Sequence, residues 1–232
     1  MNVQDPVGTS TMDQTKVDRV YHHLRQLIRD LKLPPGTHLQ KDEIAAELGV
    51  SRAPVSEAIA RLAEEMLVDV FPRHGSFVAP IRAHEIRECL FIRISLEVEA
   101  ARRVALVADE SMCNRLDDNL ADQGMSLDRG NLVQFYELDE VFHRILFDCI
   151  GYPRASRMNM TARVPTFRPR QFARLLEDRA DHTFQEHRNI ADAIRINDPE
   201  YAGAAMRAHL MMTAAAVEDA LRHLDEDEIA GA

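Results

Sequence analysis

Two short helical patterns separated by only three residues constrain the fold of this chain more than any other feature. The first pattern covers residues 42–48, and Gly49, Val50 and Ser51 separate it from the second. Two short helices joined by a tight turn that contains glycine form a helix-turn-helix, whose second helix lies in the DNA major groove. Ser51 is a type that caps helices, and Pro54 suits a first helical turn. The pattern predicts a DNA-binding element.

The segment after the second helix has the pattern of a β-hairpin. Residues 67–71 favour a strand, residues 72–76 a turn and residues 77–79 a return strand. A hairpin directly after such a helix is a wing, whose arginine and histidine suit phosphates or a minor groove and whose glycine permits close backbone approach. In the alternative reading, helices and hairpin only pack together. The predicted DNA contacts are Ser51, Arg52 and Ser56 on the helix, and Arg73, His74 and Gly75 on the wing.

This region resembles the winged helix of GntR-type transcriptional regulators. The resemblance spans residues 15–80 and is carried by the segments Leu33–Leu39, Leu48–Ile59 and Arg73–Val78. It implies that Arg52 reads an operator in double-stranded DNA and that His74 and Gly75 are wing-tip contacts.

The chain departs from that family pattern at three positions. Ser56 stands where an arginine is usual, and Asp42 stands where some relatives carry a DNA-contacting arginine. Met66 replaces the usual glycine before the wing. The first two departures bear on which operator sequence is recognised, rather than on DNA binding itself.

The charge of the chain is unevenly distributed. Its 232 residues carry a net charge of −10, of which residues 1–80 contribute −2 and residues 81–232 contribute −8. A nearly neutral DNA-binding part makes few phosphate contacts, so tight binding requires two half-sites and a homodimer. The acidic second part must face away from DNA, which disfavours a purely structural nucleoid protein.

Cysteine usage and hydropathy indicate a cytoplasmic protein without a membrane partner. The three cysteines are far apart and form no CxxC motif, which is typical of reduced thiols. No apolar run is long enough to span a membrane, and the N-terminus lacks a signal sequence. We expect a disordered tail at residues 1–12, a winged helix-turn-helix domain at 13–80 and an all-helical domain at 81–232.

Beyond residue 80 the pattern is helical almost throughout. Six helices are expected to form an antiparallel bundle, so the chain is mainly α. Helix start and stop signals place them at about residues 84–107, after Asp109, after Asn131 up to Gly151, within 153–174, at 176–196, and from Asp198 to about Leu224.

Four residues of this bundle form a candidate metal site. Asp139 and His143 are four residues apart, so both project from one face of a helix. His187 and His209 belong to the last two predicted helices. Neutral imidazoles suit Zn or Ni, and a carboxylate adds charge compensation. The alternative is that these are surface or singly hydrogen-bonded histidines, since the chain has 10.

The same region resembles the FCD ligand-binding domain of the FadR branch of GntR-type regulators. The segments Leu138–Leu146, Glu186–Ile194 and Ala205–Leu210 carry the resemblance, and six helices are typical of the VanR-like subgroup. It implies a divalent metal ion bound by Asp139, His143, His187 and His209. The chain departs from the family at Tyr152, where asparagine is common, and in the arginine-rich residues 157–174.

Arg93 is a candidate effector-binding residue. It lies close to an apolar stripe and four residues before Glu97, which also allows a simple intrahelical ion pair. In the resembling family, an arginine in a comparable position lies in the effector pocket. A guanidinium near a metal with open positions favours a small carboxylate effector.

Two function classes remain. The first is a dimeric, ligand-responsive transcriptional regulator, most often a repressor in the resembling family. The second is a metalloenzyme that uses the Asp/His site for hydrolysis or oxidation. Against the enzyme, the sequence has no nucleophile motif and no general base beside the histidines.

Overall fold

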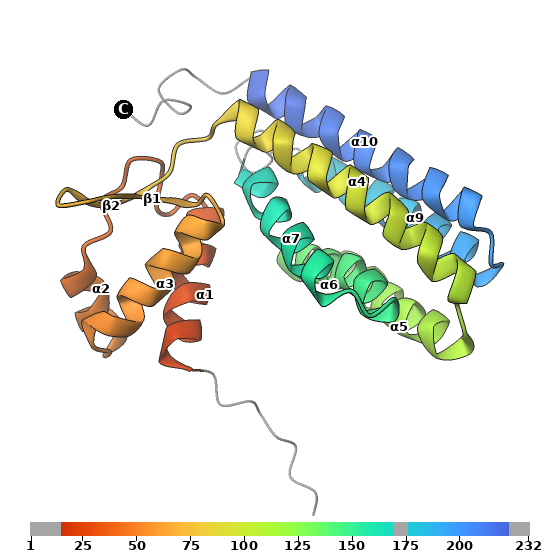
Figure 1. Ribbon diagram of the computed structural model, residues 1–232, viewed down its shortest axis with the longest axis horizontal. Coiled ribbons are helices and arrows are strands. Elements are labelled where there is room, and N and C mark those ends of the chain that lie inside the picture. Colours follow the sequence, from red (N-terminus) through yellow and green to blue (C-terminus); the bar gives the residue numbers. More distant parts are fainter. Residues whose placement is uncertain (1–14, 169–175, 223–232) are drawn as a thin grey trace, which may run out of the picture.

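The chain folds into two parts, a small winged part and a larger helical bundle (Figure 1). The computed structural model describes residues 15–168 and 176–222. The tail predicted for residues 1–12 lies outside these described residues. The mainly α fold, with a winged helix-turn-helix before a helical bundle, is confirmed.

The winged part begins with an amphipathic helix that supplies much of its core. Thr15 caps this helix by accepting a hydrogen bond from the backbone of Asp18. The elements are α1 (Lys16–Arg29), α2 (Lys41–Leu48), α3 (Arg52–Glu64), β1 (Val68–Phe71) and β2 (Gly75–Val78). The two strands pair antiparallel, with Val68 opposite Val78, and form the predicted wing.

The turn between α2 and α3 has the predicted position. Gly49 ends α2 with a left-handed φ of 63°, a conformation that glycine adopts without a Cβ clash. Ser51 occupies the cap position of α3, but its side chain makes no capping hydrogen bond. On the inner side of α3, Val55, Ile59 and Leu62 are buried. The helix therefore packs on the domain as expected, while its capping differs from the expectation.

The bundle contains six α-helices among the described residues, as predicted. They are α4 (Ala83–Val107), α5 (Glu110–Asp128), α6 (Leu132–Cys149), α7 (Pro153–Arg163), α9 (Leu176–Arg195) and α10 (Pro199–Arg222), with a 3₁₀ turn, η1 (Val164–Thr166), after α7. The long helices α4 and α10 run side by side (Figure 1). None of the helices in the described residues is long and apolar enough to cross a membrane.

Three polar side chains start bundle helices as predicted. Asp109, Asn131 and Asp198 accept hydrogen bonds from backbone amides three residues later. Such side chains satisfy N–H groups that the first turn of a helix leaves unpaired. The helix predicted to end near Leu224 reaches Arg222 within the described residues, and Leu224 itself lies outside them. The loop predicted after the short helix lies partly outside as well, in residues 169–174.

The two parts contact each other through α1, α6 and η1. Val164 of η1 is buried in the same hydrophobic cluster as the core of the winged part. Arg25 of α1 lies 3.5 Å from a carboxylate oxygen of Glu140 on α6. The helical part therefore supplies side chains to the core of the winged part.

Candidate metal centre and nucleic-acid interface

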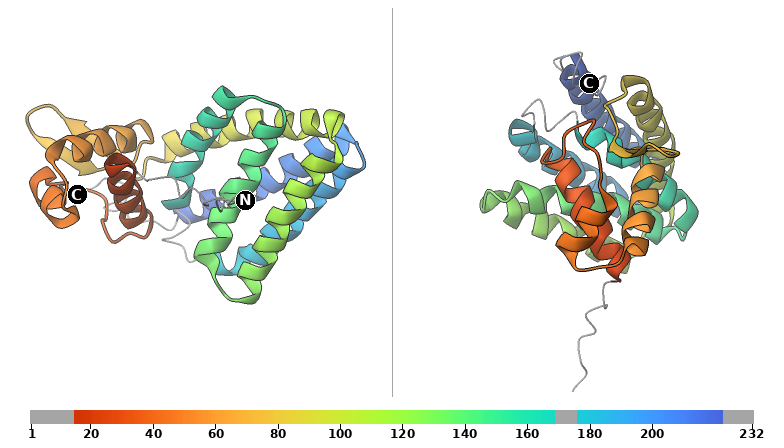
Figure 2. Two further views of the ribbon diagram at one scale, coloured as in Figure 1. Left: turned by 90° about the horizontal axis from the view of Figure 1, so that it is seen from below. Right: turned by 90° about the vertical axis from the view of Figure 1, so that its left-hand side faces the viewer.

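The predicted DNA-contacting residues lie at one end of the molecule. Figure 2 shows α2, α3 and the hairpin projecting from the bundle at this end. The predicted contacts Ser51, Arg52, Arg73 and His74 are exposed, and Ser56 and Gly75 are partly exposed.

Arg52, the predicted base-reading residue, has an acidic neighbour. Its Nε lies 3.1 Å from Oδ1 of Asp42, and both side chains are largely exposed. An exposed pair of this kind contributes little to stability, but it orients the guanidinium. Asp42 can therefore influence the orientation in which the Arg52 guanidinium meets DNA.

The structure gives a reason for glycine at position 75 that the sequence did not indicate. Its φ is 117°, and a Cβ at this position would lie 2.5 Å from Nε2 of His38. The imidazole of His38 stacks on Phe77, with ring centroids 4.8 Å apart. A larger residue here would need His38 to move and would hold a strained φ, so glycine suits the packing of the wing, and its predicted role in DNA contact stays a prediction.

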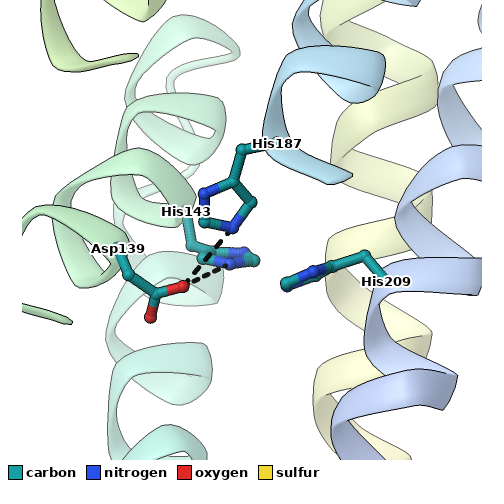
Figure 3. A group of neighbouring side chains, drawn as sticks. All are labelled: Asp139, His143, His187 and His209. Carbon is teal, nitrogen blue, oxygen red and sulfur yellow. Dashed lines mark ion pairs between the residues drawn. The ribbon is translucent and has the colours of Figure 1, made fainter. Parts of the chain in front are cut away.

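The four predicted metal ligands meet inside the bundle (Figure 3). Asp139 and His143 come from α6, His187 from α9 and His209 from α10, and each offers one ligand atom within 4.8 Å of the others. All four residues are at most 4% exposed. Oδ1 of Asp139 lies 3.7 Å from Nε2 of His143 and 3.4 Å from Nε2 of His187. The interpretation as surface histidines is therefore wrong, whereas the interpretation as singly hydrogen-bonded histidines is not excluded by burial.

Each imidazole is held through its Nδ1 atom by a partner from another helix. Nδ1 of His143 contacts a carboxylate oxygen of Glu97 on α4. Nδ1 of His187 lies 2.9 Å from Oε1 of Gln123 on α5, and Nδ1 of His209 lies 2.7 Å from Glu186. Because the partners of His187 and His209 are acceptors, Nδ1 of each of these two rings carries the proton and Nε2 keeps its lone pair. The donor atoms are thus three imidazole Nε2 atoms and one carboxylate oxygen.

Two buried arginines accompany the acidic residues. Nη2 of Arg163, at the end of α7, donates to Oδ2 of Asp139 at 2.5 Å, so the other oxygen remains directed at the histidines. Nε of Arg93 donates to Oε1 of Glu97 at 2.9 Å. The intrahelical ion pair considered for Arg93 therefore forms, but it is buried and joins the same network through Glu97.

The protonation states of this network suit a metal ion. Burial would raise the pKa of Asp139, but the charge of Arg163 and the contact with His143 hold that pKa well below its usual value. Burial and neighbouring imidazoles hold the pKa values of His187 and His209 well below the usual range. The carboxylate is ionised and these two imidazoles are neutral near pH 7, as metal ligation requires.

The residues present fit a divalent cation. Within the described part of the chain, the buried Nε2 atoms of His143 and His187 have no hydrogen-bond partner, and Nδ1 of His143 contacts Glu97 without the geometry of a hydrogen bond. Unpartnered polar atoms are unusual in a protein interior, and these belong to a ligand set of three nitrogens and one oxygen.

The sequence reasoning missed the supporting partners of the site. Glu186 directly precedes His187, and this adjacency was the one local sign that Glu186 lies near the site. Gln123 and Arg163 lie far from their partners along the chain and carried no signal. Glu140, adjacent to Asp139, faces Arg25 of the winged part instead of the histidines.

Comparison with known proteins matches both parts of the chain. Residues 16–78 match the model of bacterial regulatory proteins of the gntR family, and residues 88–212 match that of the FCD domain. The chain is 36% identical over 202 residues to an uncharacterized HTH-type transcriptional regulator of Streptomyces ambofaciens, covering 86% of this chain and 84% of that protein. It is 33% identical over 194 residues to the HTH-type transcriptional repressor RspR of Escherichia coli, covering 83% and 84%.

A solved structure shows the same fold. Escherichia coli McbR/YncC superimposes with a TM-score of 0.76 at 18% identity, covering 88% of this chain and 98% of that one. At that identity the likeness concerns the arrangement of helices and strands.

Proposed function

This chain belongs to the gntR family of bacterial regulatory proteins and carries an FCD domain, and from this we propose a ligand-responsive repressor that binds a divalent metal ion and a small carboxylate effector. The family consists of transcriptional regulators, so the metalloenzyme alternative is set aside. Repressor names among the relatives support the sign of regulation. The six-helix bundle supports assignment to the FadR branch and its VanR-like subgroup.

The operator would be bound by residues 13–80 and the effector and metal by residues 81–232. The proposed DNA contacts are Ser51, Arg52, Ser56, Arg73, His74 and Gly75. Their exposure at one end of the molecule supports this assignment. The near-neutral charge of this part supports a homodimer on a palindromic operator. The widely spaced cysteines support a location in the cytoplasm.

One observation carries the metal proposal: Asp139, His143, His187 and His209 offer four buried ligand atoms within 4.8 Å of one another. Zn or Ni would suit three imidazoles and one carboxylate. Each histidine is oriented by an acceptor on a different helix, so the bundle would present the ligands without large rearrangement.

The effector would act on helix α4. A carboxylate on the metal and on Arg93 would join α4 to α6, α9 and α10. Helix α4 follows the wing directly through residues 79–82, and Arg82 pairs with Asp69 of β1 at 2.5 Å. A shift of α4 would therefore re-aim the wing, provided that the effector binds one arrangement more tightly than the other.

The test is metal content together with DNA binding in matched histidine variants. We expect about one Zn or Ni per chain in the parent and in His182→Ala, an exposed histidine on α9. His187→Ala and His209→Ala should lose the metal and the effector response while they keep some affinity for the upstream DNA of the gene. Equal metal content in all four proteins, or none in the parent after incubation with Zn or Ni, would rule out the site.

A further inference from the structure

We infer that the effector of this site is a short dicarboxylate, with one carboxylate on the metal and the second held by Arg163 and Asn159 of α7. The inference rests on the proposed function and specifies the chemical class of its ligand. It is carried by two independent observations, the balance of buried charge and the position of buried polar atoms without partners.

The buried charges cancel before a metal is added. Two carboxylates, Glu97 and Asp139, face two guanidiniums, Arg93 and Arg163, and all four residues are at most 4% exposed. The carboxylate of Glu186 contacts His209, but Arg179 balances its charge at 3.1 Å near the edge of the bundle. The carboxylates and guanidiniums around the ligands therefore cancel in charge.

A divalent ion would add two positive charges to this interior. Neutral imidazoles do not offset that charge, and an uncompensated charge in a protein interior is strongly unfavourable. A monocarboxylate would leave one positive charge, whereas a dicarboxylate would restore neutrality. The charge balance therefore favours a ligand with two acidic groups.

Helix α7 offers donors for the second acidic group. Asn159 is 0% exposed and Arg163 is 2% exposed. Within the described residues, neither amide atom of Asn159 has a hydrogen-bond partner, and neither do Nε and Nη1 of Arg163. The two residues are four positions apart, so they share one face of the helix.

Arg163 connects these donors to the metal ligands. Its Nη2 already binds Asp139, and its Nη1 lies 3.8 Å from Glu97, so the guanidinium stands beside the ligand set. A carboxylate on the free guanidinium edge and on the amide of Asn159 would satisfy atoms that are costly to leave unpaired. A short dicarboxylate would then span from the metal to α7.

The experiment titrates acids of matched length into the metal-loaded full-length protein by calorimetry. Malonate, succinate and glutarate are compared with propionate, butyrate and valerate, and with gluconate as a hydroxylated monoanion. We expect at least one dicarboxylate to bind about tenfold or more tightly than the monocarboxylate of equal carbon number. Metal content is measured after each titration, so that removal of metal by the acid is recognised.

Three variants test the second subsite. Asn159→Leu replaces an unpartnered amide by an apolar group of similar size, so it should fold, and it should lose much of the dicarboxylate preference. Arg163→Gln should lose nearly all of it. Arg157→Gln changes an exposed arginine of the same helix and should match the parent. Metal content is expected to stay unchanged in Asn159→Leu and Arg157→Gln.

The outcomes separate this inference from the proposed function. A parent that takes up no metal overturns the proposed site, and the dicarboxylate with it. A metal-loaded parent that binds butyrate or gluconate as tightly as any dicarboxylate, or that binds no dicarboxylate, overturns the inference alone. So does a preference that survives unchanged in Asn159→Leu and Arg163→Gln.

Discussion

At the scale of single residues, Gln123 shows how a neutral side chain prepares a charged site. Its Oε1 accepts from His187, and its Nε2 donates to Asn119 at 2.7 Å. The amide of Asn119 in turn donates to the backbone oxygen of Leu138, directly before Asp139. Two amides of α5 therefore link His187 to the backbone directly before Asp139 and fix which nitrogen of His187 carries the proton.

Replacing Gln123 should weaken the metal site without removing a ligand. We expect Gln123→Leu to lower metal affinity by about 10–100-fold, because the imidazole of His187 loses the acceptor that orients it. Competition with a chromogenic chelator measures this affinity. Gln185→Leu, the same change at an exposed position of α9, is the control. Equal affinities in both variants would show that His187 is oriented by other contacts.

Arg52 should dominate operator recognition on α3. Arg52→Ala is expected to cost about 1–3 kcal/mol per half-site and to relax the preference at one base pair, since a bidentate contact to guanine is lost. Arg52→Lys keeps the charge but not the planar fork, so it should retain non-specific affinity and lose discrimination. Fluorescence anisotropy at fixed salt, on the native and substituted operators, measures both. Parent-like discrimination by either variant would contradict this docking.

At the scale of elements, the turn between α3 and β1 contains a residue in an unfavourable conformation. Met66 has a φ of 58°, in the left-handed region where a Cβ costs about 1–2 kcal/mol. Met66 is the position where the resembling family usually carries glycine, and the structure gives the physical reason for that preference.

Met66→Gly should therefore stabilise the winged part. We expect the free energy of unfolding to rise by about 1 kcal/mol, because glycine relieves the backbone strain while some packing of the half-buried methionine is lost. Met66→Ala keeps the Cβ and loses the same packing, so it isolates the backbone contribution. Chemical denaturation of the three proteins provides the comparison. A glycine variant no more stable than the alanine variant would refute the strain.

Local signals explain which elements could be predicted from the sequence. Asp109, Asn131 and Asp198 cap the helices that they precede, because a cap depends only on the next three residues. The structure of the residues at the end of α7 and directly after it could not be predicted from local signals. The burial of Arg163 depends on Asp139, 24 positions away, and that of Val164 depends on the winged part. The four proposed metal ligands were predicted from residue type and spacing together with the family resemblance, whereas their supporting partners are distant in sequence and gave no such signal.

At the scale of the whole molecule, the two parts differ in charge and in the partners proposed for them. Residues 1–80, which include the winged part that would meet DNA, carry a net charge of −2, whereas the remainder carries −8 and extends away from that end. With so little positive charge on the DNA-binding part, a single copy would bind an operator weakly.

The protein should therefore be a homodimer both free and on DNA. Light scattering at micromolar concentration is expected to give twice the chain mass of 26.3 kDa. On a palindromic operator, the same measurement should give two chains per duplex, and on an isolated half-site affinity should fall steeply. A mass of one chain in both states would count decisively against the proposed assembly.

The burial of Val164 in the core of the winged part also bears on how such regulators diversify. A recombination event near residues 79–82 would join the DNA-binding part of one ancestor to the effector part of another. In the present chain, Leu67 and Arg25 of the winged part line one small cavity together with Val164 and Phe167 of the helical part. In a recombined chain these two pairs would come from different ancestors and would not have been selected to fit each other. Exchange of parts between lineages would therefore disturb this contact, and the pair of Arg25 with Glu140, unless the donor carried compatible residues.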